Sequence, residues 1–201
     1  MEKFISLRNK VFEAKENKFH HSLIACCSEI LFFILNNNEL SLPTLLDICS
    51  IDSYDFWTKI RFFIELEFFL PNTLKENFLD LEKTIIFIYS WKSGSHICNK
   101  VASLSGQSTS NFLENREIQE DFFFKRLLHL TAIQIQDLAE VLTLDNQIAE
   151  TTWKLMKEIL SKETSAFINK NVIQFILSSF YSVCKLFWKE NPVTFSQIIM
   201  K

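Results

Sequence analysis

Two adjacent thiols and two adjacent imidazoles lie near the start of the sequence. Cys26 and Cys27 follow His20 and His21 closely, and a cysteine beside a histidine is the arrangement of a thiol nucleophile with its base. Apolar residues around them recur at three- and four-residue steps, which predicts a helix over about 19–35. On that helix Cys27 falls on the apolar stripe, where cysteine behaves as a small hydrophobic residue. The pattern therefore favours a core thiol over a catalytic one.

The sequence also gives little support for a metal site or for a pair of acid–base catalytic residues. The four histidines, at positions 20, 21, 96 and 129, lack the paired spacing of metal ligands. Glu65 with Glu67, and Asp80 with Glu82, are carboxylate pairs separated by one residue. Residues at that spacing point away from each other on a helix, so neither pair can share a site. We therefore expect no enzymatic activity, no cofactor and no metal.

Composition indicates an all-α fold. The 201 residues include only 2 Gly and 3 Pro, whereas 48% are apolar. β-Hairpins, Gly-rich phosphate loops and dinucleotide-binding folds depend on glycine turns, so these classes are excluded. The elements that position any functional residue must therefore be helices.

Charge and cysteine content exclude further classes. The formal net charge of −3 argues against a DNA-wrapping surface, which needs a concentrated basic face. No apolar stretch reaches the ~18 residues of a membrane span, and the N-terminus lacks the basic-then-apolar order of a secretory signal. Five cysteines without C-x-x-C spacing are typical of reduced thiols in an intracellular protein.

The chain reads as two helical lobes joined by one loop-like segment. Both glycines and a run of serines fall between residues 90 and 110, a composition typical of a loop. We therefore expect a first lobe over 1–92, a linker over 93–116 and a second lobe over 117–201. Periodicity and breakers predict helices over about 19–35, 53–69, 73–91, 117–142, 146–160 and 169–188, with short ones from Pro43 and Pro192.

Runs of phenylalanine mark the helices of both lobes. The runs Phe62-Phe63, Phe68-Phe69 and 122–124 cannot face one core entirely, because each step along a helix turns by about 100°. Some of these rings must face a second surface. That surface is either the other lobe or a groove for a partner's peptide.

Several segments resemble the retinoblastoma family of pocket proteins. The stretch 18–33, Lys-Phe-His-His-Ser-Leu-Ile-Ala-Cys-Cys-Ser-Glu-Ile-Leu-Phe-Phe, is similar to the signature near the end of the family's first box. In that signature a Phe-His pair precedes Ser-Leu-x-Ala-Cys and a glutamate followed by apolar residues. The similarity continues, in family order and spacing, through Leu42-Pro43, Tyr54 to Trp57, Leu81-Glu82, Ser90-Trp91, Leu128 to Leu130, Asp137-Leu138, Trp153, Asn169 to Lys185 and Thr194 to Lys201.

The resemblance implies two cyclin-like helical boxes, a partial A box and a B box, packed on each other. It also implies a non-enzymatic nuclear scaffold that binds peptide segments of nuclear regulators, represses transcription in cell-cycle control and reaches DNA only indirectly. A different class stays open, namely a cyclin-box structural subunit that packs against a larger partner without peptide-groove activity.

Two binding sites follow from the resemblance. A groove on the B box accepts the Leu-x-Cys-x-Glu peptide of chromatin regulators, and Tyr181, Lys185, Leu186 and Phe195 match its tyrosine, its lysine and two apolar lining positions. The tyrosine hydroxyl is suited to bonding a peptide backbone, and the ammonium is suited to an acidic side chain. Without the family, a core tyrosine and a surface lysine would be the simpler interpretation.

The second family site holds the acidic activation segment of E2 promoter-binding transcription factors. The corresponding positions here are Thr58, Arg61 and Glu65, with Glu82 on the next helix. A glutamate in place of a lysine opposite an acidic ligand replaces attraction with repulsion. This departure from the family pattern argues against binding of the factor in the family's manner, and a partner of altered charge stays open.

Overall fold

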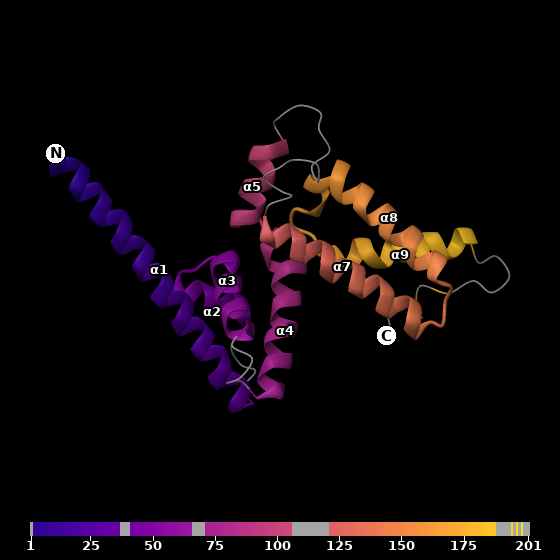
Figure 1. The fold of residues 1–201 in the computed structure, drawn as a ribbon, viewed down its shortest axis with the longest axis horizontal. Coiled ribbons are helices and arrows are strands. Elements are labelled where there is room, and N and C mark those ends of the chain that lie inside the picture. The colour runs from indigo at the N-terminus through magenta and orange to yellow at the C-terminus, as the bar shows by residue number, and fades with distance from the viewer. Residues whose placement is uncertain are drawn as a thin grey trace. The chain divides into compact units, whose positions relative to one another are not determined.

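The computed structural model describes residues 2–36, 41–65, 71–105, 121–187 and positions 194, 196 and 198, with side chains from residue 18 onward. Among these residues there are helices and turns but no strands, which confirms the all-α prediction. None of the described helices combines the length and hydropathy that crossing a membrane requires. The helices are α1 (Glu2–Ile34), α2 (Leu42–Cys49), α3 (Ser53–Glu65), α4 (Asn72–Phe87), α5 (His96–Ser105), α7 (Phe122–Val141), α8 (Asn146–Lys162) and α9 (Val172–Phe187), with 3-10 turns η1 (Tyr89–Trp91) and η3 (Thr164–Phe167) (Figure 1).

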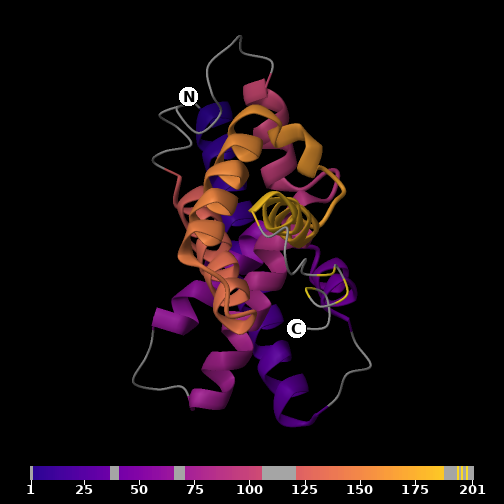
Figure 2. The same ribbon diagram turned by 90° about the vertical axis from the view of Figure 1, so that its right-hand side faces the viewer.

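The chain forms two compact units, Met1–Ile85 and Ile86–Lys201. In the first unit α2 and α3 lie against the C-terminal half of α1 (Figure 1). In the second unit α7, α8 and α9 pack against one another, as Figure 2 shows from the side, while α5 contacts η1 and η3.

The buried face of α1 differs from the predicted one. The spacing predicts a buried stripe through Cys27 and Leu31, yet both are exposed, whereas Ser22, Ala25 and Cys26 are buried. These three small side chains let α1 approach α2 and α3 closely. The Ser22 hydroxyl tolerates burial because it donates to the carbonyl oxygen one turn earlier, at 2.8 Å. The core thiol of this helix is therefore Cys26, and the assignment of Cys27 to the core is wrong.

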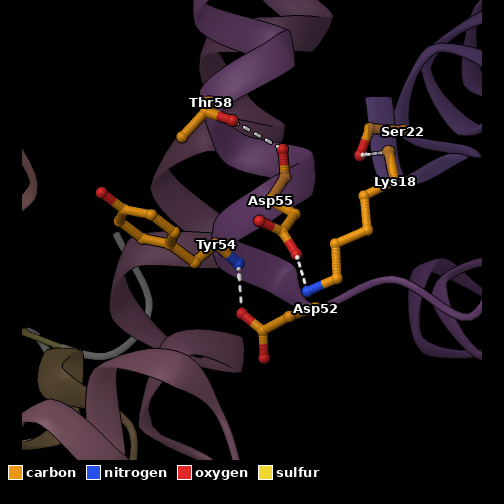
Figure 3. A network of polar contacts seen from close by, with 6 residues as sticks. All are labelled: Lys18, Ser22, Asp52, Tyr54, Asp55 and Thr58. Carbon is orange, nitrogen blue, oxygen red and sulfur yellow. Dashed lines mark hydrogen bonds and ion pairs between the residues drawn. The ribbon is translucent and has the colours of Figure 1, made fainter. Parts of the chain in front are cut away.

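Polar contacts fasten α1 to the start of α3 (Figure 3). The Asp52 carboxylate accepts a hydrogen bond from the Tyr54 backbone N–H at 2.7 Å, as an N-terminal cap does. Next to it, Asp55 in the first turn of α3 lies 3.5 Å from the Lys18 ammonium on α1. The cap fixes where α3 begins, and the ion pair sets α1 beside that end.

Aromatic packing joins α3 to α4 in the same unit. Phe56, Trp57 and Phe78 are buried, and the Phe63 ring stacks on Phe78 with centroids 5.9 Å apart. The Trp57 indole Nε1 donates to the Glu82 carboxylate on α4 at 3.3 Å. A buried carboxylate is thus satisfied within the packing of these two helices.

The first part of the predicted linker is helical. Composition indicates a loop over 93–116, but α5 occupies His96–Ser105. Ser95 begins this helix, because its hydroxyl oxygen accepts from the Cys98 backbone N–H at 3.2 Å and its hydroxyl donates to the Ser90 carbonyl at 2.6 Å. Ile97, Cys98 and Val101 are then buried in the second unit. Serine at this position is a helix cap rather than a sign of loop.

Short polar side chains also start the helices of the second unit. The Asp121 carboxylate accepts from the Phe123 N–H at 2.8 Å, and Asp145 accepts from the Gln147 N–H at 3.1 Å. Asn171 accepts from a backbone N–H two residues later, at 2.9 Å, and so begins α9. These caps place the starts of the three helices at Phe122, Asn146 and Val172, where the sequence predicts starts at about 117, 146 and 169.

The phenylalanine runs divide between core and surface. Phe123 and Phe124 at the start of α7 are both buried, with ring centroids 5.5 Å apart. Phe62 and Phe122 are exposed. The run at 68–69 lies outside the described residues.

Candidate functional site

Helix α9 carries the residues predicted for peptide binding. Its buried face consists of Val172, Ile176, Ser179, Phe180, Val183 and Cys184, which follow the spacing of an amphipathic helix. Asn171 caps this helix, so its first turn begins at Val172. Tyr181 and Lys185 lie beside this face, the first half-buried and the second exposed.

Tyr181 and Lys185 form a pair on adjacent turns. Residues four apart are neighbours on a helix surface, and the Lys185 ammonium lies over the Tyr181 ring, with Nζ 5.4 Å from its centroid. The ring holds the ammonium by a cation–π interaction. The pair combines an aromatic face, a phenolic hydroxyl and a positive charge within one helical turn.

Two apolar residues are predicted beside this pair, and the structure describes one of them. Leu186 follows Lys185 on the exposed side of α9, with 71% of its surface accessible. Phe195 lies outside the described residues. Phe187, which the sequence reasoning missed, is half exposed and extends the apolar end of the helix. Its position directly after Leu186 in the run of 186–188 is the signal that would have identified it.

The residues predicted for the transcription-factor site lie in the first unit. The Thr58 hydroxyl is half-buried and donates to the Asp55 carbonyl of its own helix at 2.7 Å. The Arg61 guanidinium lies over the Trp57 ring, with Cζ 5.8 Å from its centroid. Glu65 ends α3, and its side chain lies outside the described part of the chain.

Glu82 is part of the packing between α3 and α4. Only 1% of its surface is exposed, and its carboxylate accepts from the Trp57 indole. The structure therefore brings Arg61 and Glu82 together around one tryptophan. In this arrangement Glu82 stabilises the packing of α3 against α4.

Two thiols of the first unit, Cys26 on α1 and Cys49 on α2, have raised pKa values. Burial, and to a lesser extent the neighbouring Cys27 thiol, raise the pKa of the Cys26 thiol to about 12. Burial also raises the pKa of the Cys49 thiol. A protonated thiol is a poor nucleophile, and the described residues contain no group of three or more His, Cys, Asp or Glu suited to hold a metal ion.

Two family models match consecutive stretches of the chain, and their boundary lies after residue 101, later than the boundary between the two compact units at 85–86. Residues 7–101 match the family model described as retinoblastoma-associated protein A domain, and residues 119–201 match retinoblastoma-associated protein B domain. The two matches occur in that order, and the second includes α7, α8 and α9.

Individual relatives carry the same description. The retinoblastoma-related protein of Cocos nucifera is 40% identical over 79 residues, which cover 39% of this chain and 8% of the relative. Retinoblastoma-related protein 1 of Nicotiana benthamiana is 42% identical over 77 residues, or 38% of this chain and 8% of the relative. Retinoblastoma-related protein 3 of Zea mays is 21% identical over 277 aligned positions, which cover 90% of this chain and 27% of the relative. The chain thus spans a small part of the length of each of these relatives.

Proposed function

Since this chain belongs to the retinoblastoma family of pocket proteins, we propose that it is a non-enzymatic scaffold that binds short peptide segments of nuclear regulators. Its two matched regions are the A and B boxes, which are cyclin-like helical folds. The observation that carries the proposal is the Tyr181–Lys185 pair on α9. Both residues lie in the B-box match, and it is their resemblance to the tyrosine and lysine of the family's peptide groove that leads us to propose them as binding residues.

We propose that the groove receives a Leu-x-Cys-x-Glu segment against Tyr181, Lys185, Leu186 and Phe195. The Tyr181 hydroxyl both donates and accepts hydrogen bonds, so it suits the backbone of an extended peptide. The Lys185 ammonium favours the peptide's glutamate, and the exposed Leu186 offers apolar area to its leucine.

The role that follows is repression of transcription in the nucleus. By holding a regulator's peptide, the scaffold would bring chromatin regulators to promoters and control the cell cycle, with DNA contacted only through its partners. The acidic balance of 24 Asp and Glu against 21 Lys and Arg supports this indirect contact.

We propose that transcription factors of the E2 promoter-binding class are a second group of partners, at Thr58, Arg61 and Glu65, whereas the predicted fourth residue, Glu82, is buried against Trp57 and does not present its carboxylate to a partner. We propose that this site prefers a partner less acidic than the family's usual ligand. Arg61 is held over Trp57, Glu82 is buried, and a glutamate at position 65 repels an acidic segment.

A peptide titration tests the groove. A fluorescent Leu-x-Cys-x-Glu peptide is titrated with the wild-type chain and with Tyr181→Ala and Lys185→Ala, and anisotropy is measured. We expect saturable binding to the wild type. Either change should weaken it about tenfold or more, because each removes a side chain that we propose to contact the bound peptide.

Lys92→Ala is the matched control for this titration. Lys92 is exposed, and its ammonium lies 4.6 Å from the centroid of the Tyr89 ring, so it forms a similar lysine–tyrosine pair that is not part of α9. Its loss should leave peptide affinity unchanged. No saturable binding to the wild type, or equal weakening by all three changes, would leave the structural-subunit alternative as the better account.

A further inference from the structure

A cavity of about 300 Å³ lies between α7 and α8. The two helices are consecutive and joined by residues 142–145, so they run antiparallel and the cavity lies toward the end where they are joined. Its lining is Ala132, Ile135 and Gln136 from α7, and Asn146, Ala149, Glu150 and Trp153 from α8. None of these residues belongs to the face of α9 described above.

The floor of the cavity is apolar. Ile135 and Ala149 are buried, while Ala132 and Trp153 form half-buried walls. Alanine at both 132 and 149 leaves space between the helices where larger side chains would meet. A volume of this size is at the lower end for ligand sites, so it suits one or two aliphatic side chains rather than a large cofactor.

The rim of the cavity is acidic toward the joined end of the helices. Glu150 lines the cavity, and Gln136 Nε2 donates to the Glu140 carboxylate at 3.1 Å, which places a second carboxylate one turn further along α7. Asp137 and Asp145 are also exposed near this end. In the described part of the chain Glu150 forms no ion pair.

Two lysines follow Trp153 on α8, next to the residues that line the cavity. The Lys157 ammonium lies over the Trp153 ring, with Nζ 5.5 Å from its centroid, and Lys154 is exposed one turn before. The charge along α8 therefore changes sign from Glu150 at the cavity to Lys157 beyond Trp153. A charged ligand would bind in one direction rather than in both.

We propose that this cavity docks a peptide segment of a partner protein that presents a leucine-sized side chain next to a lysine or arginine. The aliphatic side chain fills the space between Ala132 and Ala149. The basic side chain pairs with Glu150, whose carboxylate lies at the cavity edge. Burying an apolar anchor beside a complementary charge is the arrangement that concentrates binding energy in peptide sites.

Selection from a phage-displayed random dodecapeptide library, against the full chain, tests this site. We expect enrichment of peptides that place Lys or Arg beside Leu, Ile or Met. Synthetic peptides of the enriched sequence should bind Glu150→Lys at least about tenfold more weakly, because like charges then face each other. Ala132→Trp, which fills the cavity from a half-buried position, should weaken the same peptides to a similar degree.

Glu158→Lys is the control, since it makes the same charge change on an exposed residue of α8 that does not line the cavity, although it also breaks the exposed ion pair between Glu158 and Lys162. It should leave affinity unchanged, and circular dichroism of each variant shows that the helices persist. Peptides without a basic residue, or affinities that Glu150→Lys and Glu158→Lys lower equally, would overturn the proposal. Displacement of the selected peptides by an unlabelled Leu-x-Cys-x-Glu peptide would also overturn it, because it would assign them to α9.

Discussion

Burial distinguishes two cysteines that are adjacent in the sequence. Cys26 is fully buried on the face of α1 that packs against α2 and α3, whereas Cys27 is exposed. Periodicity predicted the core position one residue too late, because it weighs hydrophobicity and not size. Small residues at 22, 25 and 26 define the packed face, and the bulky apolar residues of α1 lie next to it.

This difference predicts the order of thiol modification. Iodoacetamide at pH 8 should alkylate Cys27 well before Cys26, which is buried and whose pKa of about 12 leaves a thiolate fraction on the order of 10⁻⁴. Residue-specific mass spectrometry over time measures the order. Cys26 should react at the rate of Cys27 once the chain is unfolded in urea, and faster alkylation of Cys26 in the folded chain would contradict its burial.

Two neighbouring threonines of α8 offer a second comparison at this scale. Thr152 is fully buried, and its hydroxyl has no hydrogen-bond partner among the described residues. Thr151 donates to the Gln147 carbonyl at 2.7 Å on the exposed side.

Thr152→Val should therefore stabilise the chain. It removes a buried unsatisfied hydroxyl at nearly constant volume, and we expect a gain of about 1 kcal/mol in the free energy of unfolding. Thr151→Val, at an exposed site, should change that free energy by less than about 0.5 kcal/mol. Urea denaturation measures both, and a loss of stability for Thr152→Val would show that its hydroxyl is satisfied.

At the scale of helices, capping residues determine where a helix begins, and composition does not. The sequence predicts the ends of α7, α8 and α9 to within about two residues and the start of α8 at 146, but it begins α7 and α9 too early, because it overlooks the caps at Asp121 and Asn171. It misses α5, because serines and glycines suggest a loop although Ser95 caps a helix with a buried face. Glycine and serine counts cannot distinguish a capped helix from a loop, since both use the same residues.

Asp121 performs two tasks at the start of α7. Its carboxylate caps the helix by accepting from the Phe123 N–H, and it also forms an ion pair with Lys100 on α5. The pair is largely shielded from solvent, with 9% of the Asp121 side chain exposed.

Replacing Asp121 separates the two tasks. Asp121→Asn keeps a capping oxygen and removes the charge, so we expect a loss of about 0.5–1 kcal/mol. Asp121→Ala removes both and should cost about 2 kcal/mol or more, because the Phe123 N–H then loses its capping acceptor in addition to the loss of the ion pair with Lys100. Thermal or urea unfolding gives the two values, and an equal loss for both variants would mean that the cap contributes nothing.

At the scale of the whole molecule, the family resemblance supplied what physical patterns could not. Composition and periodicity gave helices and an absence of evident catalytic groupings, but nothing in them singles out Tyr181 and Lys185 on α9. The family positions did, and the structure brings those two residues together. Glu82 shows the limit of such transfer, because its burial against Trp57 depends on tertiary packing. Helical spacing along a single segment also cannot predict the cavity between α7 and α8, because residues of both helices line it, including Ala132 on α7 and Ala149 on α8.

The proposed peptide groove depends on the charge at position 185. Wild-type Lys185 should favour a Leu-x-Cys-x-Glu peptide over Leu-x-Cys-x-Lys by about tenfold or more, because the exposed ammonium attracts the glutamate and repels the lysine. Lys92→Glu makes the same charge change at another exposed lysine, and it should keep the wild-type preference.

The most direct measurement is isothermal titration of both peptides into the wild type and Lys185→Glu. If α9 holds the peptide as we propose, Lys185→Glu binds the lysine peptide more tightly than the glutamate peptide, which reverses the wild-type order. If both proteins rank the peptides in the same order, or if neither peptide binds the wild type, Lys185 does not contact the ligand and the proposed groove is contradicted.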